Sequence, residues 1–389
     1  MLRLAPPARL ARLSRPLDLR VAIGMLAFSA LVLCVFRMWM FTPRFTDLKV
    51  YRAEGLALRD GLNLYGPLPG VTSLATYPPF AALIFVPASF VPIPALKVLG
   101  VALNLVLLVL VCWQSARLMD VPARAAVVPA CAFAAFAIWA EPVFTTFSYG
   151  QINLLLLALV LWDFTRPADS RLRGVGTGIA TGLKVTPGIL IVYLLLTRRL
   201  RAAATAVGAW LLTIGVSAAV DPGAVKGYWT KYLFDSHRVG RLENAVNQTI
   251  RGWLVRADHT RHTRPTELIL VAIVLVLGLA CSVLAYRWLG EPWGVLAAAV
   301  TGLLCSPISW SHHWVYCVPI AVLLWYRERS YVLPTLIVFC SFCVWYIPHK
   351  HSVELHFNGW QIAVSGWYVL YGLGFLALAA WRVRQTAQR

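Results

Sequence analysis

Lys184 is a charged residue near the middle of an apolar stretch, residues 174–197, which several glycines and a proline interrupt. A lysine near the centre of a bilayer costs about 2.5–3.5 kcal/mol to insert, so by default it marks a functional site. Alternatively, the long side chain could carry its amine to a membrane interface. The glycines and Pro187 favour a site, and we expect the amine to balance the charge of a phosphate.

The carboxylate of Asp47 is a second candidate, because it lies only a few residues beyond the first apolar stretch. A helical stretch, residues 50–58, and an aromatic turn at residues 77–80 follow it. A lone aspartate at a membrane surface is often only a solvated charge. A carboxylate within hydrogen-bond reach of a hydroxyl, however, can act as a general base. This is the role that we predict for Asp47.

Two adjacent histidines, His312 and His313, lie in a loop rich in serine and tryptophan, residues 306–314. Neighbouring side chains on a helix do not face each other, and no nearby cysteine or carboxylate completes a zinc site. We therefore predict no metal here. A hydrogen bond from an imidazole to a phosphate, with tryptophans beside a sugar, fits these residue types better.

The elements that position these residues are expected to be membrane helices. Of the 389 residues, 59% are hydrophobic and only 13% are charged, about half the charged share of a soluble domain. A spanning helix needs about 20 apolar residues, and a soluble helix would show a polar face. Four long runs contain no charge at all: residues 101–111, 154–162, 268–285 and 295–304. The sequence therefore predicts an all-α, polytopic membrane protein.

The whole chain, residues 1–389, is predicted to form one membrane domain without a soluble part or an internal repeat. Its first apolar stretch, residues 21–41, follows five arginines and continues into Arg37. This pattern indicates a retained helix instead of a cleaved signal peptide. The eight cysteines lie in or beside apolar runs and are expected to be buried small hydrophobic residues.

Arginine clusters predict the orientation, because short arginine-rich loops stay in the cytoplasm. Between the clusters at Arg173 and Arg198 there is room for only one crossing, although both ends must be inside. Two half-helices that meet around Lys184 and Pro187 satisfy both conditions. We expect about 11 to 13 membrane segments, with both termini in the cytoplasm. The expected outer loops are residues 42–94, 141–151, 221–266, 306–314 and 349–360.

The outer loop at residues 221–266 is strongly basic and also rich in tyrosine and tryptophan. Its basic residues outnumber four acids and are Lys226, Lys231, Arg238, Arg241, Arg251, Arg256, Arg261 and Arg264. Basic charge outside the membrane runs against the usual bias and suggests an anionic partner. Nucleic acid is not expected at this location, so a lipid phosphate is the natural candidate.

The order and spacing of these motifs resemble glycosyltransferase family 87. The matching segments are TDLKVY (46–51), GLNLY (61–65), YPPF (77–80), GQIN (150–153), ATGLKVTP (180–187), RR (198–199), NQT (247–249) and SPISWSHHW (306–314). The resemblance covers roughly residues 46–326. It implies a fold of the glycosyltransferase C type in the plasma membrane, with the active site on the outer face. It also implies a polyprenyl-phosphate sugar as donor.

Within this family, the chain looks most like actinobacterial mannosyltransferases that extend phosphatidylinositol mannosides and lipomannan. The resemblance implies that mannose moves from polyprenyl-phosphate-mannose to a mannose hydroxyl of a glycolipid, in α-1,2 linkage. Asp47 would be the base and the only carboxylate that acts. The donor phosphate would be bound by Lys184, His312, His313 and Arg251. Further substrate-binding residues would be Lys49, Tyr51, Tyr77, Gln151, Asn153, Asn247 and Trp310.

The expected partners are the lipid-linked donor, the glycolipid acceptor and membrane lipids, with no cofactor and no nucleic acid. Two other functions stay open. One is transfer of arabinofuranose from a decaprenyl-phosphate donor. The other is transport of a lipid-linked sugar, which broken helices also suit. A transporter would concentrate its polar groups at mid-membrane, whereas Asp47 lies in a surface loop, and this difference favours an enzyme.

Overall fold

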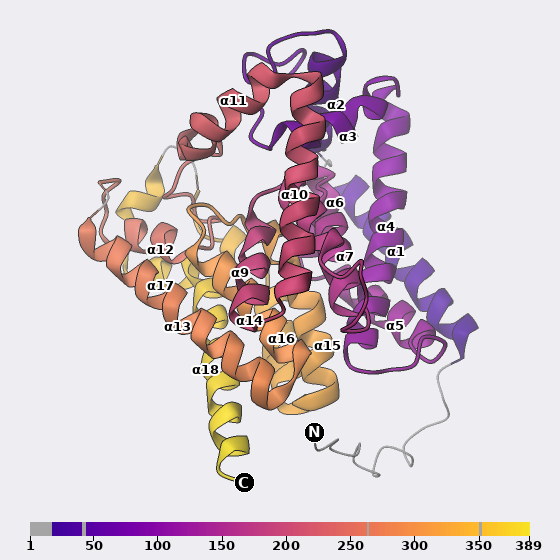
Figure 1. The fold of residues 1–389 in the computed structure, drawn as a ribbon, viewed down its shortest axis with the longest axis vertical. Helices are drawn as coiled ribbons and strands as arrows, with labels where there is room; N and C mark the ends of the chain where they lie inside the picture. The colour runs from indigo at the N-terminus through magenta and orange to yellow at the C-terminus, as the bar shows by residue number, and fades with distance from the viewer. Residues whose placement is uncertain (1–17, 41–43, 263, 350–351) are drawn as a thin grey trace.

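The computed structural model describes residues 18–40, 44–262, 264–349 and 352–389. This described part consists of helices joined by turns, with no strand (Figure 1). The first nine α-helices are α1 (Leu19–Met40), α2 (Thr46–Arg59), α3 (Pro79–Ser89), α4 (Ile93–Leu118), α5 (Val127–Ala137), α6 (Glu141–Tyr149), α7 (Asn153–Phe164), α8 (Val175–Leu183) and α9 (Ile189–Leu196). The remaining nine are α10 (Leu200–Val220), α11 (Pro222–Thr230), α12 (Ile250–Ala257), α13 (Pro265–Leu289), α14 (Glu291–Cys305), α15 (Cys317–Arg327), α16 (Val332–Cys340), α17 (Gly359–Ser365) and α18 (Trp367–Ala387).

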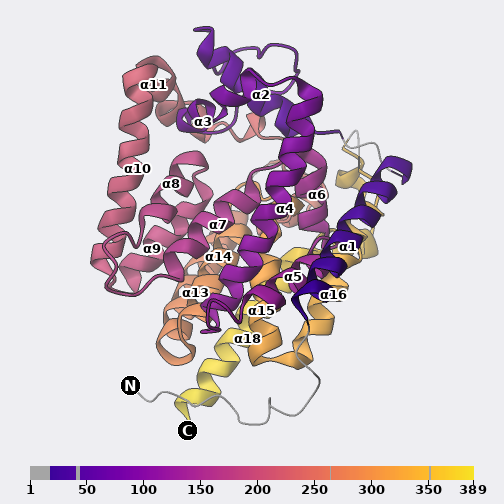
Figure 2. The same ribbon diagram turned by 90° about the vertical axis from the view of Figure 1, so that its right-hand side faces the viewer.

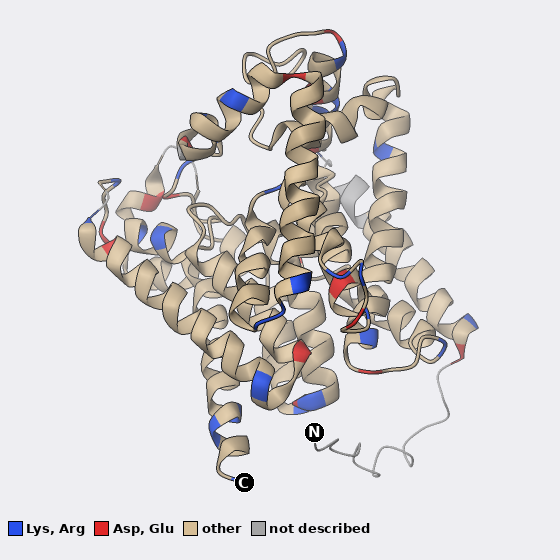
Figure 3. Cartoon of the chain, viewed as in Figure 1, with Lys and Arg blue, Asp and Glu red and all other residues tan. Residues whose placement is uncertain are grey.

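Within the described residues, three helices, α4, α10 and α13, are long and apolar enough to cross a membrane. Two bent pairs, α5 with α6 at 80° and α17 with α18 at 60°, raise the number to five if each pair is one broken span. Large apolar side chains such as Val276 and Leu277 of α13 are exposed, as expected of a surface that faces lipid. Figure 3 shows that the central parts of α10 and α13 are free of charged residues. The prediction of an all-α, polytopic membrane protein is confirmed.

Shorter apolar helices account for much of the remaining apolar sequence. They are Leu19–Val35, Pro79–Ser89, Asn153–Phe164, Thr186–Leu196, Glu291–Cys305 and Arg329–Trp345. Helices of this length do not by themselves span the roughly 30 Å of hydrocarbon in a bilayer. The expected number of 11 to 13 membrane segments therefore stays a prediction.

A few expectations lie outside the described residues. They concern the arginines before residue 18, the end of the first apolar stretch at Phe41, the start of the first outer loop at residues 42–43, and residues 263, 350 and 351 of two other outer loops.

The stretch around Lys184 is broken as predicted. Helix α8 ends at Leu183, and Lys184 itself has extended backbone with φ −154° and ψ 126°. A 3-10 turn, Thr186–Gly188, then leads into α9. Pro187 stands inside this turn, where it cannot supply the N–H that a continuous helix needs.

Glycines let α8 lie close to α10. A Cβ added to Gly178 would lie 2.3 Å from the carbonyl oxygen of Ala206, and one added to Gly182 would lie 2.2 Å from Oγ1 of Thr213. Side chains of any size would separate the two helices, so the glycines hold α8, and Lys184 at its end, at a defined depth.

Helices α2, α3 and α11 lie together at one end of the molecule in both views (Figures 1 and 2). The 21 residues of α10 connect α11 at this end with Arg199 at the other, a length of about 30 Å. Helix α14 forms part of the core, and nearly all of its residues are buried. At its first turn, Glu291 is paired with Arg173 and Arg199 and accepts a hydrogen bond from Tyr193.

Candidate active site

One face of α2 lines a cavity of about 590 Å³. Asp47, Tyr51 and Glu54 all contribute to its wall, because residues four and three positions apart lie on the same side of a helix. Asp47 stands in the first turn of α2, next to the loops that bring the remaining polar residues to the cavity.

Two close backbone contacts set the rotation of α2. Gly55 lies against α3, where a Cβ would be 2.3 Å from the carbonyl oxygen of Phe85. Gly150, with φ of 69°, lies against the first turn of α2, where a Cβ would be 2.7 Å from Cβ of Leu48. Neither contact leaves room for a side chain, so α2 cannot turn Asp47 away from the cavity.

Gln151 connects Asp47 with two tyrosines. The hydroxyl of Tyr51 donates to Oε1 of Gln151 at 2.7 Å, and that of Tyr77 approaches the same oxygen at 3.2 Å. Since this oxygen faces the tyrosines, the amide nitrogen of Gln151 is left to donate to the carboxylate of Asp47. The network therefore orients the predicted base from one side.

Burial raises the pKa of Asp47 from 3.8 to about 6. The hydrogen bond from Gln151, the positive charge of Lys184 and the hydroxyl of Thr46 oppose this shift. A carboxylate in this range is ionised at neutral pH and is more basic than an exposed aspartate. Both properties suit a general base.

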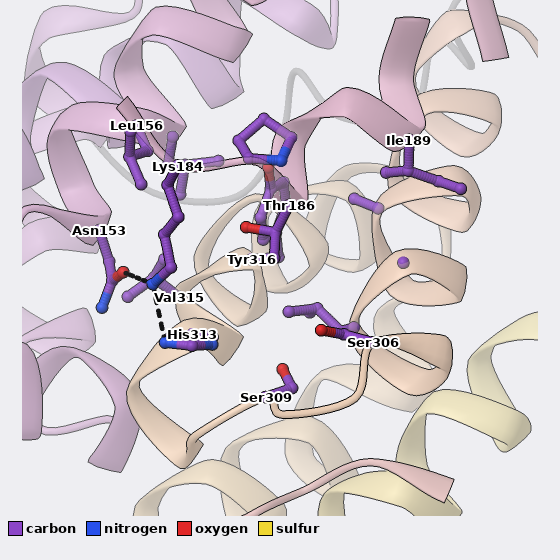
Figure 4. A pocket seen from close by; sticks show the side chains of 15 residues that line it. Asn153, Leu156, Lys184, Thr186, Ile189, Ser306, Ser309, His313, Val315 and Tyr316 are labelled. Atoms are coloured by element: carbon purple, nitrogen blue, oxygen red, sulfur yellow. Dashed lines mark hydrogen bonds between the residues drawn. The ribbon is translucent and has the colours of Figure 1, made fainter. Parts of the chain in front are cut away.

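Lys184 joins the cavity from the break between α8 and α9. Its amine donates to Nε2 of His313 at 2.8 Å and to Oδ1 of Asn153 at 3.3 Å (Figure 4). It also lies 5.2 Å from the ring centre of Tyr77. While this amine is protonated it has no lone pair to accept with, so in that state His313 accepts at Nε2 and carries its own proton on Nδ1.

His312 is buried and His313 is half-buried beside it, with ring centres 4.9 Å apart and ring planes at 84°. Burial and the nearby charge of Lys184 hold the pKa of both imidazoles well below the usual value, so both rings are neutral. Nε2 of His312 has no hydrogen-bond partner among the described residues, and His312 lines the cavity. The residue thus lines the cavity, although this nitrogen itself is buried. No group of three or more metal-binding side chains occurs in the described part of the chain, and the expectation of a metal-free site stays a prediction.

The loop that carries the histidines is anchored by buried polar residues. Nδ2 of Asn153 donates to the carbonyl oxygen of His312 at 3.0 Å. The hydroxyl of Ser311 donates to Glu141 at 2.8 Å, and the same carboxylate accepts from Trp345 and Tyr368 at 2.7 Å each. Because a buried carboxylate needs such donors, Glu141 ties the loop to α18.

Asn247 supports Trp310 and does not line the cavity. Its side chain accepts from the backbone N–H of Ser309 and donates to the carbonyl oxygen of Leu242, both at 3.0 Å. Trp310 lines the cavity, and its indole covers Gly240, where a Cβ would be 2.6 Å from Cζ2 of the ring.

The predicted residues thus divide into two groups. Those that line the cavity are Asp47, Tyr51, Tyr77, Gln151, Lys184, Trp310, His312 and His313. Asn153 joins them through Lys184. Lys49 is exposed, and Arg251 is half-buried in α12; neither lines the cavity.

A small apolar pocket of about 40 Å³ adjoins the site. Its wall comes from α7, α14 and the start of α9 and includes Leu156, Ile189 and Leu303. Lys184 and His313 line this pocket as well as the large cavity (Figure 4). The two residues therefore stand where a polar and an apolar space meet.

Among the further residues in the wall of the cavity that are not predicted site residues, Glu54 and Arg238 carry an acidic and a basic side chain. Glu54 could have been found from its spacing, seven residues after Asp47 in the expected helix. Arg238 donates to the carbonyl oxygens of Tyr65 and Ala75 at 2.9 and 3.3 Å. Nothing in the sequence connects residue 238 with the first outer loop.

One cavity thus combines a half-buried carboxyl group of raised pKa, a lysine and two neutral histidines, which are residue types that enzymes use to move protons and to bind phosphate. The model of glycosyltransferase family 87 matches residues 75–307. The chain belongs to this family, and the resemblance seen in its motifs is confirmed. It is therefore a glycosyltransferase.

Curated relatives agree with this assignment. One from Mycobacterium tuberculosis is named polyprenol-phosphate-mannose-dependent alpha-(1-2)-phosphatidylinositol pentamannoside mannosyltransferase, and it is 34% identical over 87% of this chain and 80% of its own length. Another from the same species is named polyprenol-phosphate-mannose-dependent alpha-(1-2)-phosphatidylinositol mannoside mannosyltransferase. It is 31% identical over 94% of this chain and 92% of its own length. A pentamannoside mannosyltransferase of the same name as the first relative, from Mycolicibacterium smegmatis, is 34% identical over 74% of this chain and 70% of its own length. No solved structure matches this one.

Proposed function

We propose that this glycosyltransferase transfers mannose from polyprenyl-phosphate-mannose to a mannose hydroxyl of a phosphatidylinositol mannoside, in α-1,2 linkage. The names of the relatives support this donor, this class of acceptor and this linkage. The observation that carries the proposal is the position of Lys184 and His313, between the polar cavity of Asp47 and the apolar pocket. A lipid-linked sugar phosphate needs a cavity for its sugar and a cation at the edge of that cavity for its phosphate; the apolar pocket of about 40 Å³ has room for only a small apolar group.

In the proposed reaction, Asp47 accepts the proton of the acceptor hydroxyl. The hydroxyl oxygen attacks the anomeric carbon of mannose from the side opposite the phosphate. The bond between this carbon and the phosphate oxygen breaks, and its electron pair leaves with the polyprenyl phosphate. One inversion converts a β-linked donor into an α-linked product.

Negative charge grows on the phosphate oxygen as this bond breaks. The ammonium of Lys184 is held in place by His313 and Asn153, so it can stabilise the charge without prior rearrangement. Nε2 of His312 could add a hydrogen bond if that atom carries the ring proton. Arg251 was expected to help, but it does not line the cavity. The proposal for the phosphate therefore rests on Lys184 and the histidines.

We further propose that both termini lie in the cytoplasm and that the cavity opens on the outer face of the plasma membrane. The long helix α10 separates Arg198 and Arg199 at one end from α11 at the other, and short arginine-rich loops stay inside. Helices α2 and α3 lie beside α11 (Figure 2), which supports an outer position for Asp47.

Purified protein incubated with radiolabelled polyprenyl-phosphate-mannose and phosphatidylinositol mannosides should yield a product one mannose longer. Digestion with an α-1,2-mannosidase should then release the label. A parallel reaction with decaprenyl-phosphate-arabinose should give no product. Transfer of arabinose without transfer of mannose would replace the proposal with its closest alternative. Movement of the intact donor across the membrane of vesicles that contain the protein, without transfer of its sugar, would favour a transporter.

A further inference from the structure

Glu54 is a buried carboxyl group for which the reaction described above has no use. It is only 2% exposed, and it lines the cavity two helical turns after Asp47. The tight contact of Gly55 with the backbone of α3 fixes the rotation of this part of α2. Glu54 therefore cannot leave the cavity wall without displacing the helix.

Glu54 has less support from other side chains than Glu141, Glu291 and Glu243, and the buried Glu267 and Glu354 resemble it in having no ion pair among the described residues. Glu141 accepts from four side chains, Glu291 is paired with two arginines, and Glu243 is paired with Arg261. In the described part of the chain, Glu54 takes part in no ion pair. Its one recorded hydrogen bond comes from the backbone N–H of Thr76. A carboxyl with so little protein support that faces an open cavity is suited to bind a ligand.

The charge state of Glu54 follows from burial and from Asp47. Both raise the pKa of Glu54 from 4.5 to about 8, whereas that of Asp47 is raised only to about 6. At neutral pH, Asp47 is thus an ionised base and Glu54 a neutral acid. Two carboxyl groups whose pKa values are pushed apart in this way take different roles. A neutral carboxyl can both donate to and accept from a sugar hydroxyl.

The position of Glu54 indicates which substrate it meets. Lys184 and His313 mark the donor phosphate near Asp47, whereas Glu54 lies about 10 Å further along the axis of α2. It accepts from the backbone N–H of Thr76, and the segment that precedes Thr76 also lines the cavity. The lining of the apolar pocket does not include Glu54, which assigns Glu54 to the acceptor.

We propose that Glu54 is a specificity-determining residue that hydrogen-bonds a hydroxyl of the acceptor glycan. The inference rests on the proposed function, because it assumes a glycan acceptor. Asp47 deprotonates the reacting hydroxyl, and Glu54 holds the acceptor on the side remote from the donor phosphate.

The test compares Glu54→Ala and Glu54→Gln with the purified full-length enzyme, using polyprenyl-phosphate-mannose and a phosphatidylinositol mannoside. Loss of the hydrogen bond in Glu54→Ala should raise the KM of the acceptor about tenfold and leave the KM of the donor unchanged. Glu54→Gln remains neutral and polar and should stay within about threefold of wild type at pH 7. Asp60→Asn, which changes an exposed carboxylate at the end of the same helix, is the matched control.

A pH series separates binding from a merely structural role. Between pH 7 and 9 the wild-type KM of the acceptor should rise as Glu54 loses its proton, and that of Glu54→Gln should not. Other titratable or charged groups close to Glu54 are Asp47, Tyr51, Tyr65 and Tyr77, and Lys184, Arg238 and the histidines 237, 312 and 313 line the same cavity. All of them are present in both proteins, so only the difference between the two profiles reports Glu54.

Identical profiles for wild type and Glu54→Gln would overturn the inference, as would a donor KM that rises with that of the acceptor. If Glu54→Ala does not fold, the comparison of the pH profiles of wild type and Glu54→Gln still shows whether Glu54 binds the acceptor. Absence of transfer by the wild type with these substrates would instead refute the proposed function.

Discussion

Asp47 and Lys184 carry opposite charges in the same buried cavity, and each moderates the cost of burying the other. The positive charge of Lys184 lowers the pKa of Asp47, although burial raises it more. Asp47 therefore keeps a basicity that an exposed aspartate lacks. Two predictions concern this residue.

Replacing Asp47 with Asn should lower the transfer rate by about 10² to 10⁴, because the amide cannot accept the proton. The fold should persist, since Asn has the same size and can still accept from Gln151 and Thr46. The rate is measured with radiolabelled donor, and the melting temperature in detergent serves as the control for folding. Near wild-type transfer by this variant would exclude Asp47 as the base.

The rate should depend on pH through Asp47. With its pKa raised to about 6, the carboxylate is ionised above this pH and protonated below it. We expect kcat/KM to be level above about pH 7, to reach half its maximum near pH 6 and to fall about tenfold per pH unit well below it. A profile measured from pH 4.5 to 7.5 checks this. A fall centred near pH 4 would mean that Asp47 is not buried as the structure has it.

At the scale of elements, the break between α8 and α9 is the feature that brings a cation to the site. An unbroken helix would bond the backbone of residues 184–188 internally and would turn Lys184 with the helix face. Instead, the extended backbone at Lys184 directs its amine toward Asn153 and His313. Broken backbone of this kind is tolerated in membranes where it lines a cavity.

Lys184→Met should therefore weaken use of the donor much more than use of the acceptor. Methionine has a similar length but no charge for the phosphate. We expect the KM of the donor to rise or kcat to fall at least tenfold, about the effect of removing one charged hydrogen bond, with little change in the KM of the acceptor. Lys226→Met, on the exposed side of α11, is the control. Unchanged donor kinetics would leave Lys184 with a structural role only.

The contact of α8 with α10 gives a second prediction at this scale. Gly178→Ala should lower the melting temperature in detergent, because its methyl group would press on the carbonyl of Ala206. Overpacking of this kind costs about 1–3 kcal/mol. Gly208→Ala, on α10 itself, meets nothing within 4 Å and should be neutral or stabilising. Equal melting temperatures for the two variants would contradict the close packing of α8 on α10.

At the scale of the whole molecule, the proposals depend on which side of the membrane the cavity faces. In a variant without the eight native cysteines, a cysteine at the exposed Ser73 should react with an impermeant thiol reagent added to intact cells. Cysteines at Ser170 and Ser330 should react only after the membrane is permeabilised. Labelling of Ser170 from outside would reverse the orientation of the segment that leads to Lys184.

Much of this protein can be predicted from its sequence, because membrane helices and their breaks are local properties. Long uncharged runs predict helices surrounded by lipid, and glycines with a proline predict the break at Lys184. The chemical type of Asp47, of Lys184 and of the histidine pair also indicated a site before any fold was known.

Only the tertiary structure decided which of these residues share a cavity. Asn247 has the right chemistry for a substrate, yet it is buried in support of Ser309. Lys49 is two residues from Asp47 and therefore lies on another face of α2. Glu54 is on the cavity face because two contacts fix the rotation of α2: Gly55 of α2 meets Phe85 of α3, and Gly150, which follows α6, meets Leu48 of α2. Packing between distant segments sets the rotation of a helix about its axis. The sequence alone therefore indicated the type of chemistry but not the full set of side chains that share the cavity.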